Sequence, residues 1–148
     1  MNIRQATVDD AEEIANQNIL LAYESERMSV DYKTALAGAR AILIDPAKGF
    51  YLVAEEKKQI IGQLMITYEW SDWSNTMMWW IQSVYTKKEW RNHGVFTKLL
   101  EDIKRRAQLQ QVKILRLYTH VTNTNAQKVY EKVGWEKKPY LIYQLKKL

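Results

Sequence analysis

A strand that runs into a helix through a short polar bend is the sequence feature that most limits the fold. The run MMWWIQSVYT, residues 77–86, is typical of a buried strand. The bend KKEWRNHG, residues 87–94, ends in a single glycine, and apolar residues then recur at helical spacing: Val95, Phe96, Leu99, Leu100, Ile103 and Ala107. The first N–H groups of such a helix lack partners within it, and its dipole places positive charge there. The bend therefore predicts either an anion site or a plain helix start, in which Gly94 adopts backbone dihedral angles that other residues disfavour.

The rest of the chain alternates between segments of helical and of strand character. A first helix is predicted to follow Thr7, which with Asp10 forms a capping-box-like start, and a second from Ser29 or Asp31 to the Asp45-Pro46 pair. A further helix is predicted over 123–135. Strands are expected over residues 1–6, 49–56, 60–70 and 113–121, and the last stretch, 135–148, is expected to supply one or two closing strands. No linker or repeat interrupts this order, so residues 1–148 are expected to form a single α/β domain.

Composition narrows the classes of function. The chain has 148 residues, no cysteine and a formal net charge of +5. Disulfides, zinc-thiolate sites and a cysteine nucleophile are thereby excluded, and no metal site is expected. No apolar run approaches a membrane span and no signal-peptide core is present, so a cytoplasmic protein without membrane contact is expected. The basic residues are dispersed, so nucleic acid is not an expected partner, although net charge alone leaves that alternative open.

Two short motifs carry a resemblance to a known family. Arg91 to Phe96 fits the pattern Q/R-x-x-G-x-G/A, except that Phe96 stands where Gly or Ala is usual. The second pattern, N-x-x-A-x-x-x-Y-x-x-x-G-F/W, is met by Asn123, Ala126, Tyr130, Gly134 and Trp135. With the order of its elements, the chain resembles the GNAT superfamily of acetyl-CoA-dependent N-acetyltransferases over nearly its whole length. The resemblance implies a mixed, mostly antiparallel sheet of about six or seven strands with about four helices, in which the fourth and fifth strands splay apart.

The resemblance also implies where acetyl-CoA binds. Backbone N–H groups of Arg91, Asn92, His93, Gly94, Val95, Phe96 and Thr97 are expected to contact the diphosphate. The strand edge at Val84, Tyr85 and Thr86 is expected to pair with the pantetheine arm, with the N–H of Tyr85 or of a neighbour polarising the thioester carbonyl. Asn123 is expected to contact the same arm. Tyr130 is expected to contact the cofactor and to protonate the departing thiolate.

Transfer to an amine also needs a neutral nucleophile. A lysine-like amine with a pKa of ~10.4 is almost wholly protonated at neutral pH, so a base or a site that lowers this pKa matters greatly. The fourth strand offers no carboxylate, which leaves Glu69, Asp72, His120 or ordered water as candidates, Glu69 being the one we select. A cationic acceptor is expected to meet aromatic and acidic side chains: Tyr23, Glu24, Glu69, Asp72 and Trp73.

The leading hypothesis is an N-acetyltransferase that moves an acetyl group from acetyl-CoA directly to a primary amine of a small molecule or peptide. The alternative is a non-catalytic acyl-CoA sensor or regulatory module on the same fold, which Phe96 and the missing strand carboxylate favour. The aromatic residues in the middle of the chain also fit a core or a homodimer surface, so oligomeric state stays open.

Overall fold

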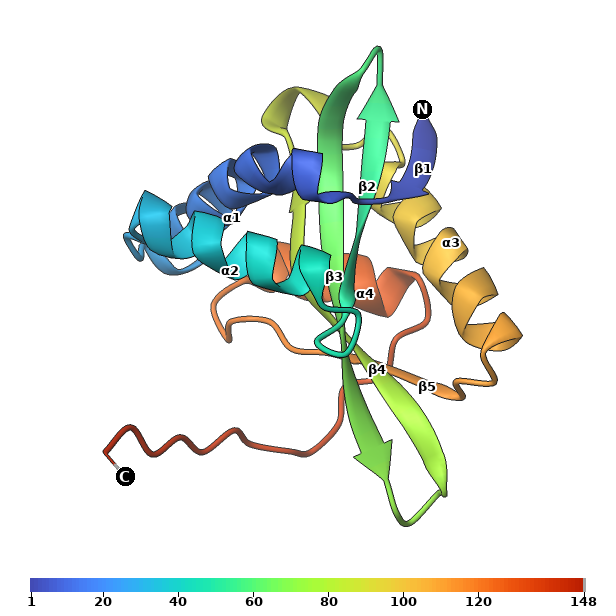
Figure 1. The fold of residues 1–148 in the computed structure, drawn as a ribbon. Helices are drawn as coiled ribbons and strands as arrows, with labels where there is room; N and C mark the ends of the chain where they lie inside the picture. The colour runs from blue at the N-terminus through green and yellow to red at the C-terminus, as the bar shows by residue number, and fades with distance from the viewer. Residues whose placement is uncertain (148) are drawn as a thin grey trace. The chain divides into compact units, whose positions relative to one another are not determined.

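The computed structural model describes residues 1–147 (Figure 1). They form two compact units, one up to Tyr118 and one from Thr119 onward. No helix in this part of the chain has the length and apolar character that crossing a membrane requires.

The first unit holds a five-stranded sheet in the order β1-β2-β3-β4-β5. The strands are β1 (Asn2–Gln5), β2 (Phe50–Glu56), β3 (Gln59–Ser71), β4 (Thr76–Thr86) and β5 (Ile114–Leu117). Neighbours are antiparallel except β4 and β5, which run parallel. Short turns join β2 to β3 and β3 to β4, whereas the connections from β1 to β2 and from β4 to the parallel β5 contain helices.

Helices cover both faces of this sheet (Figure 1). The short η1 (Val8–Asp10) leads into α1 (Ala11–Glu26), which packs with α2 (Tyr32–Ile44). Together they cover one face, around a core of Ala6, Ile14, Ala39, Ile42, Tyr51, Val53 and Ile60. On the opposite face α3 (Val95–Leu109) buries Val95, Leu99, Leu100, Ile103 and Ala107. The bend between β4 and α3 contains the short η2 (Lys88–Trp90).

The helix boundaries confirm the capping signals of the sequence. Thr7 and Asp10 form a capping box at the start of η1, which leads into α1, and the Asp10 carboxylate accepts from Thr7 N–H at 2.8 Å. Asp31 caps α2 by accepting from Thr34 N–H at 3.0 Å, and α2 ends immediately before Asp45. The Asp31 cap satisfies a backbone donor that the helix itself leaves unpaired.

The second unit contains α4 (Thr124–Lys132), preceded by its N-cap Asn123. The expected closing strands are wrong for the described residues: 135–147 contain no strand, and the sheet has five strands rather than six or seven. β5 is also shorter than the predicted 113–121. Tyr, Ile and Leu suit a strand, but they form one only when a neighbouring strand pairs with the backbone. Here the side chains of Tyr140, Leu141, Ile142, Tyr143 and Leu145 are exposed.

Candidate active site

The second half of β4 departs from regular pairing. Gln63 pairs with Tyr85, but the next pair is Met65 with Gln82, so β4 carries one residue more than β3 over this stretch. Ser83 lies within this bulge and has a φ of 50°, which is in the left-handed region. A bulge of this kind bends a strand and redirects the groups beyond it.

Beyond the bulge, one edge of β4 has no strand paired with it among residues 1–147, and we call it the open edge. β5 pairs with β4 only from Met78 to Ile81, while β4 continues to Thr86. Lys87 N–H donates to the Ile61 carbonyl on β3 at 3.0 Å. Because backbone groups alternate between the two edges of a strand, those of Tyr85 face β3, and those of Val84 and Thr86 face the open edge. The open edge is where the splayed strands were expected, and it offers the amide of Val84 rather than that of Tyr85.

The polar bend then leads directly into α3. Asn92 and Gly94 have φ values of 64° and 75°. A Cβ on Gly94 would meet no atom within 4 Å, so the backbone angle is what favours glycine here. The first helical hydrogen bond runs from Lys98 N–H to the Gly94 carbonyl at 3.1 Å, so the N–H groups from Val95 to Thr97 precede the hydrogen-bonded ladder. The first turn of α3 holds no acidic residue, so the partial positive charge of the helix start is not neutralised there.

The side chains of the bend differ in what they present. Asn92, His93 and Thr97 are exposed, whereas Val95 is buried and Phe96 is half-buried. His93 Nδ1 lies 2.8 Å from the Arg91 carbonyl oxygen, to which it donates when protonated at that nitrogen, and its ring lies 6.0 Å from that of Trp90. Because the side chain of Val95 is buried, this residue can offer a ligand only its backbone N–H group.

Arg91 joins the bend to α1. Its Nη2 donates to Glu24 Oε2 at 2.5 Å, its Nε donates to the Thr86 carbonyl at 3.0 Å, and its guanidinium lies 5.6 Å from the centre of the Tyr85 ring. Lys88 Nζ lies 3.6 Å from Glu24 Oε1, and Tyr85 OH donates to the same oxygen at 3.4 Å. The predicted cofactor residue Arg91 and the predicted acceptor residue Glu24 are therefore an ion pair at the open edge of β4.

These contacts set the charge state of the cluster. Burial acts to raise the pKa of the Glu24 carboxyl, but the hydrogen bond and charge of Arg91, helped by Lys88, outweigh it and hold that pKa below its usual range. Burial and the neighbouring Glu24 charge raise the pKa of the Tyr85 phenol. Glu24 is therefore an anion at neutral pH, suited to pairing with a cation. Tyr23 lies next to it, exposed, with the Arg27 guanidinium 5.2 Å from its ring centre.

The other predicted acidic residues lie toward the far end of the β3–β4 hairpin. Glu69 pairs in register with Met78, roughly 20 Å along β4 from Val84 at roughly 3.3 Å per residue. Its Oε2 lies 3.5 Å from Nη1 of Arg116 on β5, a partner that no sequence pattern predicted. Asp72 Oδ1 accepts from Trp73 N–H at 3.0 Å in the turn beyond, and the Trp73 side chain is 96% exposed. The structure thus separates Glu69, Asp72 and Trp73 from the open edge.

The second unit holds the remaining predicted residues. Asn123 Oδ1 accepts from Ala126 N–H at 3.2 Å and begins α4, so its side chain has a structural function. The Tyr130 ring lies 6.3 Å from that of Trp135, and burial raises the pKa of its phenol. His120 Nδ1 lies 2.8 Å from Thr122 Oγ1, within a local turn. The predicted site residues therefore fall into two sets, one in each unit.

Comparison with known proteins identifies this arrangement of elements. The acetyltransferase (GNAT) family model matches residues 9–135. The chain belongs to this family. Solved structures agree: a possible acetyltransferase from Clostridium difficile 630 is 37% identical, with 99% of this chain and 97% of that one covered and a TM-score of 0.91. No curated protein matched significantly.

Two more distant structures share the GNAT fold. A predicted acetyltransferase from Clostridium acetobutylicum, solved with acetyl-CoA, is 18% identical, with coverage of 97% and 95% and a TM-score of 0.81. A ribosomal-protein-alanine N-acetyltransferase from Brucella melitensis biovar Abortus 2308 is also 18% identical, with 99% of both chains covered and a TM-score of 0.77. The family supports acyl transfer to an acceptor as the general chemistry of this chain.

Proposed function

We propose that this GNAT protein transfers the acetyl group of acetyl-CoA to a primary amine of a small molecule or peptide. The observation that carries the proposal is the open edge of β4 at Val84 and Thr86, which leads through the bend into the uncapped first turn of α3. Family membership and a neighbouring structure solved with acetyl-CoA support the choice of donor.

The residues of the bend fit a diphosphate. The N–H groups from Val95 to Thr97 precede the hydrogen-bonded ladder of α3, no acidic side chain lies in that turn, and Arg91 and Lys88 add positive charge. Together these are the donors and charges that an anionic ligand requires. Arg91 is held by Glu24 in this structure, so it would have to exchange a carboxylate for a phosphate oxygen.

The open edge fits an amide-bearing arm. Val84 and Thr86 direct backbone groups to that side, as an added strand would require. Arg91 already donates to the Thr86 carbonyl, so an incoming amide N–H would compete for this oxygen. Bound acetyl-CoA would supply an activated acyl group, and the Val84 N–H would be the nearest backbone donor for its carbonyl oxygen.

For the remaining steps we propose one group each. Tyr130 protonates the departing thiolate, and Asn123 contacts the cofactor arm. Glu24 attracts a protonated amine electrostatically, with Tyr23 beside it. Because Glu69 lies roughly 20 Å along β4 from Val84, it is too far away to take the proton of the amine directly or through one water, so we assign that step to ordered water. Glu69, Asp72 and Trp73 are better suited to the far end of a long acceptor.

The open edge and the bend would equally serve an acyl-CoA sensor without turnover. The absence of a carboxylate along β4 itself, Thr76–Thr86, favours this alternative.

A paired experiment separates the two functions. Calorimetry with acetyl-CoA tests donor binding, and a thiol-release assay over a panel of small amines and peptides tests turnover. We expect binding together with amine-dependent thiol release, and a fall in kcat of about 10²-fold in Tyr130→Phe with donor affinity kept. Tyr32→Phe, at the start of α2, is the control and should behave as wild type. Binding without turnover on any amine would select the sensor, and no binding at all would reject both.

A further inference from the structure

A buried polar network lies beneath the β4 bulge. The Gln63 side chain is fully buried, and its Nε2 donates to Asn18 Oδ1 at 2.8 Å. Asn18 Nδ2 in turn donates to the phenol oxygen of Tyr51, a residue only 3% exposed, at 3.0 Å. Gln63 pairs in register with Tyr85, and Tyr51 pairs with Met65, whose partner on β4 is Gln82. The network thus connects α1, β2 and β3 to the two pairs that flank Ser83.

Polar side chains such as these are unusual in a protein interior. The network lies on the sheet face that α1 and α2 cover, where Val53 and Met65 pack in the apolar core. Apolar side chains of similar size would avoid the cost of burying polar groups, and Gln63 Oε1 is buried without a hydrogen-bond partner among the described residues. Buried polar networks restrict a structure to one arrangement, because each alternative leaves a polar group unpaired.

The arrangement that this network would restrict is a strained one. Ser83 has a φ of 50°, which a residue with a Cβ adopts only when its surroundings enforce it. The extra residue at the bulge determines which backbone groups beyond it face the open edge. If the bulge relaxed or moved by one residue, the groups of Val84 would no longer point to that side.

We infer that Tyr51, Asn18 and Gln63 are positioning residues that hold the Ser83 bulge, and through it aim the Val84 amide at the acyl group of the donor. The part of this inference that concerns the reaction rests on the proposed function. The part that concerns the Ser83 bulge can be tested in the free protein. Tyr51 is central, because its phenol accepts from Asn18, which holds the Gln63 side chain, and because Tyr51 pairs with Met65 opposite the start of the bulge.

The first test measures the free protein. In Tyr51→Phe we expect the Tyr85 amide, which faces β3 beside the bulge, to exchange hydrogen about tenfold faster, while amides of the β1–β2 pair keep their rates. Tyr68→Phe is the matched control: it removes a phenol from the other face of the same sheet and should leave Tyr85 unchanged. Equal exchange in wild type and Tyr51→Phe would overturn the inference.

The second test uses the reaction and a double-mutant cycle. Tyr51→Phe should lower kcat about tenfold and leave the donor dissociation constant within about twofold of wild type. Glycine adopts positive φ without strain, so in a Ser83→Gly background the same change should cost much less. A loss of kcat that is equal in both backgrounds, or a lowered melting temperature with unchanged kcat, would contradict a positioning function.

The two proposals fail separately. If calorimetry detects no acetyl-CoA binding to the wild-type protein, the proposed function fails, whereas the exchange rate of Tyr85 still reports whether the network holds the bulge.

Discussion

At the scale of single residues, the pair of Arg91 and Glu24 brings two predicted roles into conflict. Arg91 was expected to serve the diphosphate and Glu24 the acceptor, yet they bind each other at 2.5 Å. The pair is partly exposed, with 42% and 23% of the two side chains accessible, so its net contribution to stability is small. On the proposed function its effect on ligand binding is larger, because a phosphate bound at Arg91 would have to displace the carboxylate.

We therefore predict that Glu24→Gln tightens acetyl-CoA binding. Removing the carboxylate frees Arg91 and Lys88 for the diphosphate, and a gain of about 0.5–1 kcal/mol corresponds to roughly two- to fivefold in the dissociation constant. Isothermal calorimetry at low salt measures this change in the dissociation constant. Glu26→Gln, an exposed change of equal charge on the same helix, is the control. Weaker binding in Glu24→Gln, or an equal gain in both variants, would show that Glu24 does not compete for Arg91.

At the scale of elements, the start of α3 depends on a glycine in β3. A Cβ on Gly62 would lie 2.6 Å from Val95 Cγ1 and 3.1 Å from the Tyr85 carbonyl oxygen. Val95 is the first residue of α3 and is buried. Gly62 therefore allows the helix to begin close against the sheet, where its first turn lies beside the open edge of β4.

We predict that Gly62→Ala lowers the free energy of unfolding by about 1–3 kcal/mol, because the added methyl group forces Val95 and the first turn of α3 outward. Acetyl-CoA affinity should fall with it. Gly38→Ala is the control: it lies inside α2 with no atom within 4 Å of the added Cβ, and it should raise stability by about 0.5–1 kcal/mol. Urea denaturation of both variants measures the two effects. Equal stability of Gly62→Ala and wild type would mean that α3 does not require this close approach.

Some elements could be predicted from local sequence signals and others could not. Local signals were sufficient for the start of η1, which leads into α1, and for the start of α2, because Thr7, Asp10 and Asp31 act within one turn of the element they begin. They failed for 135–147, because a strand depends on a partner distant in the sequence. The bend at Gly94 was predictable from one glycine between two periodic patterns. The bulge at Ser83 was not, because serine in a strand gives no signal for a positive φ.

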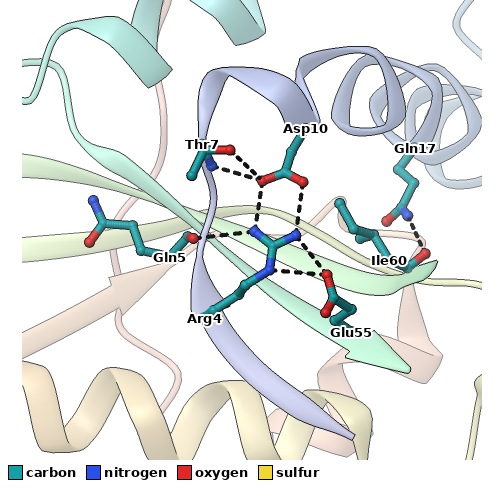
Figure 2. Close-up of polar contacts among 7 residues, drawn as sticks. All are labelled: Arg4, Gln5, Thr7, Asp10, Gln17, Glu55 and Ile60. Carbon is teal, nitrogen blue, oxygen red and sulfur yellow. Dashed lines mark hydrogen bonds and ion pairs between the residues drawn. The ribbon is translucent and has the colours of Figure 1, made fainter. Parts of the chain in front are cut away.

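At the scale of the whole molecule, one arginine connects the first two strands of the sheet with the turn that leads into α1. Arg4 on β1 donates two hydrogen bonds to Asp10, at 2.8 and 2.9 Å, and two more to Glu55 on β2, as Figure 2 shows. The hydrogen bonds from Arg4 hold the pKa of the Asp10 carboxyl below its usual range. Asp10 also accepts from Thr7 N–H, so the same carboxylate fixes the turn into α1.

This pKa shift makes part of the molecule's stability dependent on pH. An aspartate in the unfolded chain titrates at about pH 3.9, and Asp10 titrates lower in the folded protein. The stabilisation is therefore fully present above about pH 4 and is lost as the pH falls through the folded-state pKa. We predict that Asp10→Asn lowers the free energy of unfolding by about 1–3 kcal/mol at neutral pH, and that its difference from wild type shrinks as the solution is acidified below about pH 4.

Urea denaturation of both proteins from about pH 7 to about pH 3 measures this difference. Asp9→Asn is the matched control, because it removes the same charge from the exposed neighbouring residue and should remain close to wild type across the range. Asparagine can still accept from Thr7 N–H, so the comparison isolates the ion pair with Arg4 from the cap. A difference between wild type and Asp10→Asn that stays constant down to about pH 3 would mean that Arg4 does not stabilise the charged form of Asp10, and that other carboxylates determine the acid sensitivity of the fold.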